Sequence, residues 1–124
     1  MSFFRSLRSS FANAWRGLAL AFRTERSFRL QAAAAVIVLA AAFILPIQPW
    51  QRALVLLATA SVLVLELMNS MIERLVDLVK PRLHEYARDI KDLMAAAVLT
   101  AALFALVLGL LVFGPYVLPF LNRV

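Results

Sequence analysis

A stripe of polar side chains runs along one side of an otherwise apolar stretch of the sequence. It consists of Glu66, Asn69, Ser70, Glu73 and Asp77. At 3.6 residues per turn, these spacings place every member of the stripe on one face of an α-helix. The apolar run that begins at Ala53 leads into the stripe without a break, and a carboxylate inside such a run costs roughly 2.5–3.5 kcal/mol on membrane-insertion scales. We therefore interpret the stripe as part of a functional site.

Further carboxylates and a lysine could join the stripe in chemistry on phosphates. Outside Glu66, the acidic residues are Glu25, Glu73, Asp77, Glu85, Asp89 and Asp92. Two or more carboxylates beside phosphate groups suit Mg²⁺, a hard cation with oxygen ligands, and Lys91 can neutralise phosphate charge that the cation leaves. This combination favours phosphoryl transfer. The few glycines form no glycine-rich phosphate loop, which excludes the known soluble kinase scaffolds.

The composition is that of an integral membrane protein. Apolar residues make up 64% of the 124 positions and charged residues 16%, whereas soluble domains are nearer half apolar and a quarter charged. The mean hydropathy is +0.87. The net charge of +6 does not indicate a nucleic-acid partner, because the basic residues stand at the ends of apolar runs rather than on one soluble module. The absence of cysteine excludes disulfides and thiol chemistry.

We expect an all-α membrane protein with one helix on the membrane surface and three helices across it. Residues 1–24 alternate aromatic residues at helical spacing with arginines, which is typical of an amphipathic surface helix. A secretory signal peptide is the alternative, but the long apolar run begins only at Leu30. The apolar runs predict membrane helices at 28–45, 50–79 and 90–113.

Prolines, glycines and charges predict where these helices end. Residues 46–49 form a short turn, and Lys80-Pro81 stops the second span, because the residue before a proline resists the helical region. Residues 82–89 form a charged connection. Gly114-Pro115 closes the last helix, and residues 116–124 form an interfacial tail.

The distribution of basic residues predicts the orientation. Most arginines and lysines precede the first span or lie between residues 80 and 92, whereas the first turn and the tail carry only Arg52 and Arg123. The positive-inside rule then places the N-terminus and the 80–92 loop in the cytoplasm and the C-terminus outside. We expect a multi-pass protein of a bacterial inner membrane, with the carboxylates gathered at its cytoplasmic side.

The stripe also carries a resemblance to a known family. Residues 66–77 resemble the E-x-x-N-[ST]-x-x-E-x-x-x-D signature of the prokaryotic diacylglycerol kinases, a family that includes undecaprenol kinases. Further segments match in order: residues 15–18, 25–29, 84–85, 91–92 and 96–99. The chain departs from the better-known members at Asn13, Gln31 and Asp89, where they have a tyrosine, a glutamate and, nearby, an arginine.

The resemblance implies a lipid kinase that uses ATP and Mg²⁺ and assembles as a homotrimer with shared sites. By the same resemblance, Glu66 is the catalytic base that takes the proton from the lipid hydroxyl, and Glu25 and Glu73 are the Mg²⁺ ligands. The implied nucleotide contacts are Asn13, Glu25, Asn69, Glu73, Asp77, His84, Lys91 and Asp92. The implied lipid contacts are Glu66, Ser70, Arg29 and Gln31.

Simpler structural interpretations exist for the same residues. Glu66 could pair with an arginine during helix assembly, and Glu73 and Asp77 could form a solvated helix end. Glu25 could complement the dipole of the helix that follows it, and Lys91 could extend its ammonium group to the interface. The shared helix face and the resemblance favour the site.

Three classes of function compete. The first is an enzyme, a lipid kinase that converts diacylglycerol to phosphatidic acid or, alternatively, phosphorylates undecaprenol. The second is a small ion-coupled transporter subunit with Glu66 as the carrier, and the third is a structural membrane partner whose acidic face pairs with another protein's arginines. A transporter needs ionisable groups on both sides of the midplane, and the outer halves of the predicted spans carry no acid. We therefore favour the lipid kinase.

Overall fold

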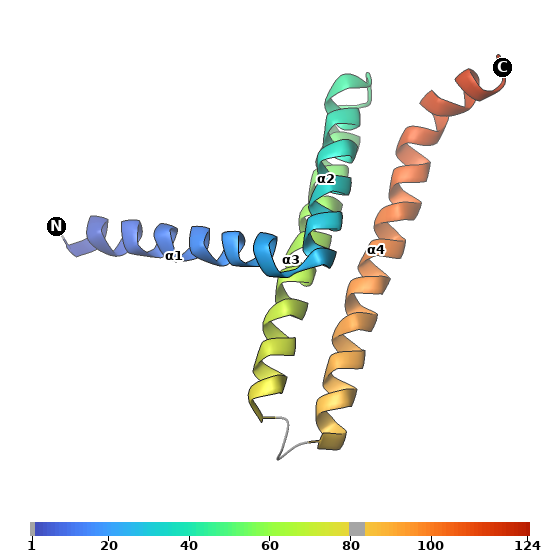
Figure 1. Cartoon of the computed structure of the whole chain (residues 1–124). Helices are drawn as coiled ribbons and strands as arrows, with labels where there is room; N and C mark the ends of the chain where they lie inside the picture. Colours follow the sequence, from blue (N-terminus) through green and yellow to red (C-terminus); the bar gives the residue numbers. More distant parts are fainter. Residues whose placement is uncertain (1, 80–83) are drawn as a thin grey trace.

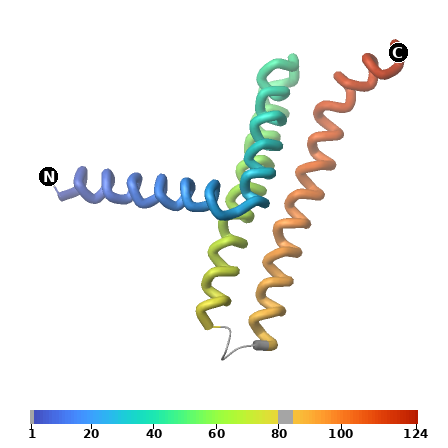
Figure 2. Tube along the Cα trace, viewed as in Figure 1, coloured from blue at the N-terminus to red at the C-terminus, as the bar shows by residue number. Residues whose placement is uncertain are grey.

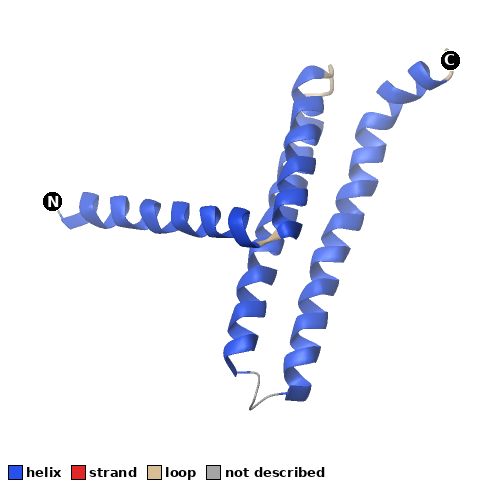
Figure 3. Cartoon of the chain, viewed as in Figure 1, coloured by secondary structure: helices blue, strands red, loops and turns tan. Residues whose placement is uncertain are grey.

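The described part of the chain folds into helices alone. The computed structural model describes residues 2–79 and 84–124, and for His84 it describes only the backbone. The helices are α1 (Ser2–Thr24), α2 (Arg26–Ile44), α3 (Pro49–Val79) and α4 (His84–Leu121). Figure 3 shows that short loops are the only other structure in these ranges. The predicted all-α class is confirmed.

Helix α1 extends away from the other three helices (Figure 1). Phe4, Phe11 and Trp15 share one face of α1 by helical spacing, and all three are exposed. An exposed face of this kind is unfavourable in water but matches a helix that lies in the headgroup layer with its apolar side toward the acyl chains. The arrangement agrees with the predicted surface helix.

Helices α2, α3 and α4 are each long and apolar enough to cross a membrane. Large apolar side chains such as Leu57, Leu103 and Phe104 point outward, as they must where lipid rather than water surrounds the helices. The 31 residues of α3 make it about 46 Å long at 1.5 Å per residue, which exceeds the hydrocarbon core of a bilayer. Its last turns therefore emerge from the lipid, and these turns carry the charged end of the stripe.

Helix α3 is the central element, and it packs against both α2 and α4 (Figure 2). The tightest packing is a small cluster of buried residues, Ala42, Ile47, Val55 and Val112. Two polar contacts secure the same end of the bundle. Arg52 donates from Nε to the Ala42 carbonyl oxygen at 2.8 Å, and the Tyr116 hydroxyl donates to the Pro46 carbonyl oxygen at 3.0 Å. This end of the bundle is thus held by packing and hydrogen bonds that involve all three spans.

Helix α4 is longer at both ends than the predicted 90–113 span. It begins at His84, so most of the predicted 82–89 connection is helical. Glu85 in its first turn favours this start by complementing the helix dipole. The prediction that Gly114-Pro115 ends the helix is wrong, because α4 continues through Pro115 and Pro119 to Leu121. Proline bends such a helix without ending it, and Figure 1 shows the bend near the C-terminus. Lys80 and Pro81, the predicted stop of α3, lie outside the described residues.

Overpacking at Ala42 should destabilise the bundle. This residue is 0% exposed, so Ala42→Leu should lower the unfolding free energy by about 1–3 kcal/mol. The matched control is Ala40→Leu, which adds the same atoms at an exposed position of the same helix. Thermal unfolding in detergent micelles measures the difference. Equal melting temperatures for the two variants would contradict this packing.

Candidate functional site

A sharp corner between α1 and α2 places Glu25 beside α3. Glu25 is the single residue between the two helices, and its backbone is extended, with φ −108° and ψ 104°. The Arg29 guanidinium holds the corner by donating to the carbonyl oxygens of Phe22 at 2.7 Å and Arg23 at 3.2 Å. These carbonyls belong to the last turn of α1, where a cation is also favoured by the helix dipole.

Apolar contacts reinforce the same corner. Phe28 is 3% exposed and Ala21 is also buried. The Phe28 ring meets Phe22 edge to face, with the ring centroids 5.1 Å apart. An aromatic pair of this geometry contributes beyond the area that it buries, so the angle between α1 and α2 is fixed by specific packing.

Glu66 and Ser70 are buried on the face of α3 that meets this corner. Their exposed fractions are 3% and 7%, and the Ser70 hydroxyl donates to the Glu66 backbone carbonyl oxygen at 3.2 Å. Within residues 2–79 and 84–124, no hydrogen bond or ion pair reaches the Glu66 carboxylate. A buried carboxylate without a protein partner lowers the stability of a fold. Glu66 is therefore not present to stabilise this fold, and we expect its partner to be a ligand.

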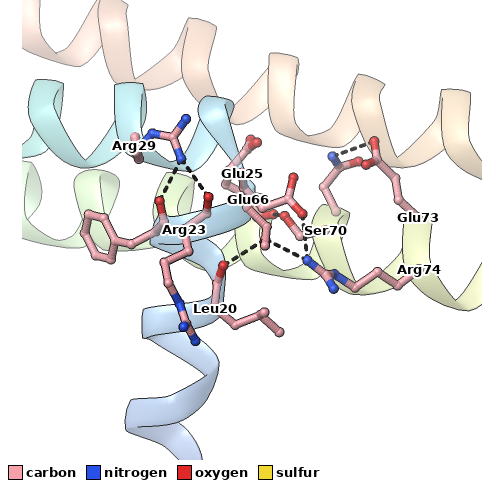
Figure 4. A network of polar contacts seen from close by, with 11 residues as sticks. Leu20, Arg23, Glu25, Arg29, Glu66, Ser70, Glu73 and Arg74 are labelled. Carbon is pink, nitrogen blue, oxygen red and sulfur yellow. Dashed lines mark hydrogen bonds and ion pairs between the residues drawn. The ribbon is translucent and has the colours of Figure 1, made fainter.

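Arg74 joins α3 to the end of α1. Its guanidinium donates to the Thr24 hydroxyl at 2.7 Å and to Glu25 Oε1 at 3.1 Å. Thr24 in turn donates to the Leu20 carbonyl oxygen at 2.8 Å. Figure 4 shows Arg74 reaching from α3 toward Leu20 and Glu25, with Glu66 and Ser70 beside them.

Asn69 and Glu73 form a second hydrogen-bonded pair on α3, and Glu73 is labelled in Figure 4. The Asn69 amide nitrogen donates to Glu73 Oε1 at 3.2 Å. This bond fixes the orientation of the amide, because the flipped amide would place its oxygen against a carboxylate oxygen. The Asn69 amide oxygen is buried and has no hydrogen-bond partner. An acceptor in this position suits a donor or a cation supplied by a ligand.

The end of the stripe pairs with α4. Lys91 Nζ lies 2.6 Å from Asp77 Oδ1, and both side chains are partly exposed. This ion pair connects the two helices at the charged end of the bundle, where α3 has emerged from its apolar run. A lysine in this position can contact both its carboxylate partner and an approaching phosphate.

The carboxylates suit Mg²⁺ as a partner of nucleotide phosphates rather than as a metal enclosed by protein. In the described part of the chain, no three histidine, aspartate or glutamate side chains come together to enclose a metal ion. Mg²⁺ usually keeps several waters and takes one or two carboxylates plus phosphate oxygens. The Glu25 carboxylate, the Glu73 carboxylate and the partnerless Asn69 oxygen are donors of the right chemical kind.

Other predicted site residues lie outside this group of contacts. Asn13 is exposed in α1 and accepts a hydrogen bond from Arg16. Gln31 is half-buried and lines an apolar cleft of about 550 Å³ between the three spans. Asp92 is exposed on α4, and the predicted contact of the His84 side chain falls outside the described residues.

Sequence reasoning missed Arg74 and Thr24 as members of the site. Arg74 follows Ser70 by one helical turn and Glu66 by two, so it borders the same face of α3. This spacing was visible in the sequence. What the sequence did not reveal is its partner, because Thr24 and Glu25 are reached only through the folded corner.

Comparisons with known proteins match most of the chain to one family. The sequence profile described as "Prokaryotic diacylglycerol kinase" matches residues 12–113. The chain is 40% identical over 105 residues to a "Diacylglycerol kinase" of Synechocystis, covering 84% of this chain and 60% of that protein. It is 38% identical over 106 residues to the "Undecaprenol kinase" of Bacillus subtilis, covering 86% of each. It is 32% identical over 93 residues to the "Diacylglycerol kinase" of Escherichia coli K12, covering 75% of this chain and 76% of that protein.

Removal of the Phe28 ring should loosen the corner that presents Glu25. Phe28→Ala should lower the unfolding free energy by about 3–5 kcal/mol, the usual cost of deleting a buried phenylalanine. Phe104→Ala is the control, because Phe104 is exposed on a membrane helix. Thermal unfolding in micelles compares the two variants. A Phe28→Ala protein as stable as the control would show that the corner is not packed as described.

Proposed function

Because the chain belongs to the prokaryotic diacylglycerol kinase family, we propose that it transfers the γ-phosphoryl group of ATP to the primary hydroxyl of diacylglycerol. A lipid kinase is the class of enzyme that the family and its named relatives establish. The observation that carries the proposal is the buried Glu66 carboxylate, which has no protein partner in the described chain and lies beside the membrane-surface corner.

Glu66 is the proposed general base. It accepts the proton of the lipid hydroxyl as the hydroxyl oxygen bonds to the γ-phosphorus. The bond from that phosphorus to the bridging oxygen breaks, and ADP leaves with its electron pair. The products are phosphatidic acid and ADP. A base inside the apolar region suits an acceptor that is itself anchored in the lipid, because only the headgroup end of the acceptor has to reach the protein.

The charged end of α3 is the proposed nucleotide site. Glu25 and Glu73 would hold Mg²⁺, which neutralises phosphate charge when bound. Asn69 is fixed by Glu73 and would offer its free oxygen to the ligand. Lys91 and Asp77 are already paired at 2.6 Å and would contact the nucleotide at the same charged end of the bundle.

The remaining predicted contacts are proposed in the same frame. His84 is the first residue of α4 and Asp92 follows about two turns later, so both lie toward the charged end of the bundle. Ser70, Arg29 and Gln31 are the proposed lipid contacts. Ser70 is buried beside Glu66 and Arg29 braces the corner, so these two support the reacting end of the lipid more directly than Gln31, which lines the cleft.

We further propose a homotrimer with sites shared between protomers. One observation supports a shared site. Helix α1 points away from its own bundle (Figure 1), so Asn13 can meet a nucleotide more readily on a neighbouring copy.

The proposed location is the bacterial inner membrane, with the N-terminus and the segment 80–92 on the cytoplasmic side. Three helices capable of crossing the membrane make it an integral membrane protein. The arginines of α1 and of the first turn of α2 then face the leaflet on the cytoplasmic side, where ATP is available. The carboxylates of the site lie on that same side.

A direct transfer assay tests the reaction and its acceptor. Purified protein in mixed micelles should transfer labelled phosphate from ATP to diacylglycerol in the presence of Mg²⁺. Undecaprenol is the second acceptor to be tested, since one relative is named for it. Faster transfer to undecaprenol would correct the acceptor, and transfer to neither lipid would contradict the proposed function.

Replacement of the proposed base should abolish turnover while leaving the fold intact. Glu66→Gln keeps the shape of the side chain but removes the base, so kcat should fall by roughly 10²–10⁴-fold. Glu85→Gln is the control, because Glu85 is exposed in the first turn of α4. Unchanged turnover in Glu66→Gln would remove this residue from the chemistry.

A further inference from the structure

The guanidinium of Arg74 makes a contact that the proposed reaction does not yet use. It lies one residue beyond Glu73 on α3, yet it reaches Thr24 and Glu25, which are 50 and 49 positions away in the sequence. Both contacts come from the same nitrogen. Arg74 therefore connects the charged end of α3 to the corner that carries Glu25.

No other polar group holds the Glu25 carboxylate in the described part of the chain. Its bond to Arg74 is its one hydrogen bond and its one ion pair there. Glu25 stands between two helices in an extended conformation, so helix geometry does not fix the direction of its side chain. The direction depends on Arg74.

The contact leaves Glu25 able to bind a ligand. Arg74 bonds to Oε1, and an ionised carboxylate has further acceptor positions on both oxygens. The side chains are 48% and 24% exposed for Arg74 and Glu25, respectively. An ion pair that is this exposed adds little to stability. Its effect is therefore on the direction of the carboxylate and not on the strength of the fold.

We propose that Arg74 is a positioning residue that holds the Glu25 carboxylate against α3, in the direction needed to bind a divalent cation together with Glu73. The inference rests on the proposed function, because that function assigns Glu25 to the cation. Thr24 acts as the second anchor of the same nitrogen and is itself fixed to Leu20. Loss of Arg74 frees the carboxylate to point into solvent.

The sign of the effect separates positioning from simple electrostatics. Removal of a positive charge near a cation site should by itself tighten cation binding. Removal of a group that orients a ligand should weaken it, by roughly tenfold where such partners have been replaced in other proteins. Weaker binding in Arg74→Ala would thus run against the electrostatic trend.

The experiment measures Mn²⁺ binding to the full-length protein in micelles. Electron paramagnetic resonance reports free Mn²⁺ in the presence of a non-hydrolysable ATP analogue, with the same analogue without protein as the baseline because it binds Mn²⁺ itself. The readout does not depend on turnover. Arg26→Ala is the matched control, because Arg26 adjoins Glu25 and its side chain makes no hydrogen bond or ion pair among residues 2–79 and 84–124. Glu25→Gln and the double variant complete a mutant cycle, and thermal unfolding checks each fold.

We expect Arg74→Ala to weaken Mn²⁺ binding roughly tenfold, with a melting temperature close to that of the wild type. Arg74→Lys should recover part of the affinity, since an ammonium group can still donate to the Thr24 hydroxyl oxygen and to Glu25 Oε1. Arg26→Ala should bind as tightly as the wild type or more tightly. On the Glu25→Gln background, Arg74→Ala should cause no further loss of Mn²⁺ affinity, because each change removes the same Arg74–Glu25 interaction.

Unchanged or tighter Mn²⁺ binding in Arg74→Ala would overturn the inference. So would an equal loss on the Glu25→Gln background, which would show that Arg74 acts on the nucleotide directly. If Glu25→Gln itself binds Mn²⁺ normally, Glu25 is not a ligand and the inference fails with it. Failure of the proposed function is separate, because it appears as a wild-type protein that binds Mn²⁺ but transfers no phosphate to lipid.

Discussion

The burial of the Glu66 carboxylate in an apolar helix is the constraint on which the rest of the structure depends. A carboxylate in this setting costs several kcal/mol, and the described fold provides it with no compensating hydrogen bond. The same burial gives a lipid kinase what it needs, because the base must meet a hydroxyl group that cannot leave the membrane. The cost in stability and the proposed function thus arise from one residue.

A lipid kinase must also bring the phosphates of a water-soluble nucleotide close to that buried base. The corner between α1 and α2 serves this purpose in the proposed site. Arg29, Phe22 and Phe28 fix the corner, and Arg74 ties it to α3. Helical periodicity then places the remaining polar residues of α3 on one face, from the apolar segment to the charged end of the helix. Glu66 lies in the apolar segment, Glu73 lies two turns later, and Asp77 meets Lys91 at the exposed end. A single helix therefore runs from the lipid to the charged end of the bundle at Asp77 and Lys91.

Most of the helical architecture follows from the sequence, because apolar runs and prolines constrain membrane helices strongly. The surface helix, the spans and the start of α3 at Pro49 agree with the pattern. The end of α4 does not, since a proline in lipid bends a helix that it would often end in water, and Pro115 and Pro119 lie inside α4. The helical face of the stripe was also predictable. The Arg74 contact with Glu25 was not, because spacing along one helix carries no information about which distant segment will pack against it.

The lipid headgroup is proposed to meet the protein beside Glu66, at the corner between α1 and α2. A diacylglycerol with a photoreactive diazirine on the first carbons of an acyl chain can be crosslinked to the protein in the presence of Mg²⁺ and a non-hydrolysable ATP analogue, and the adducts can be mapped by mass spectrometry. The account predicts adducts on α3 around Glu66 and Ser70 and on the corner near Leu20. Adducts confined to the apolar cleft near Val55 and Leu108, with none around Glu66, would contradict it.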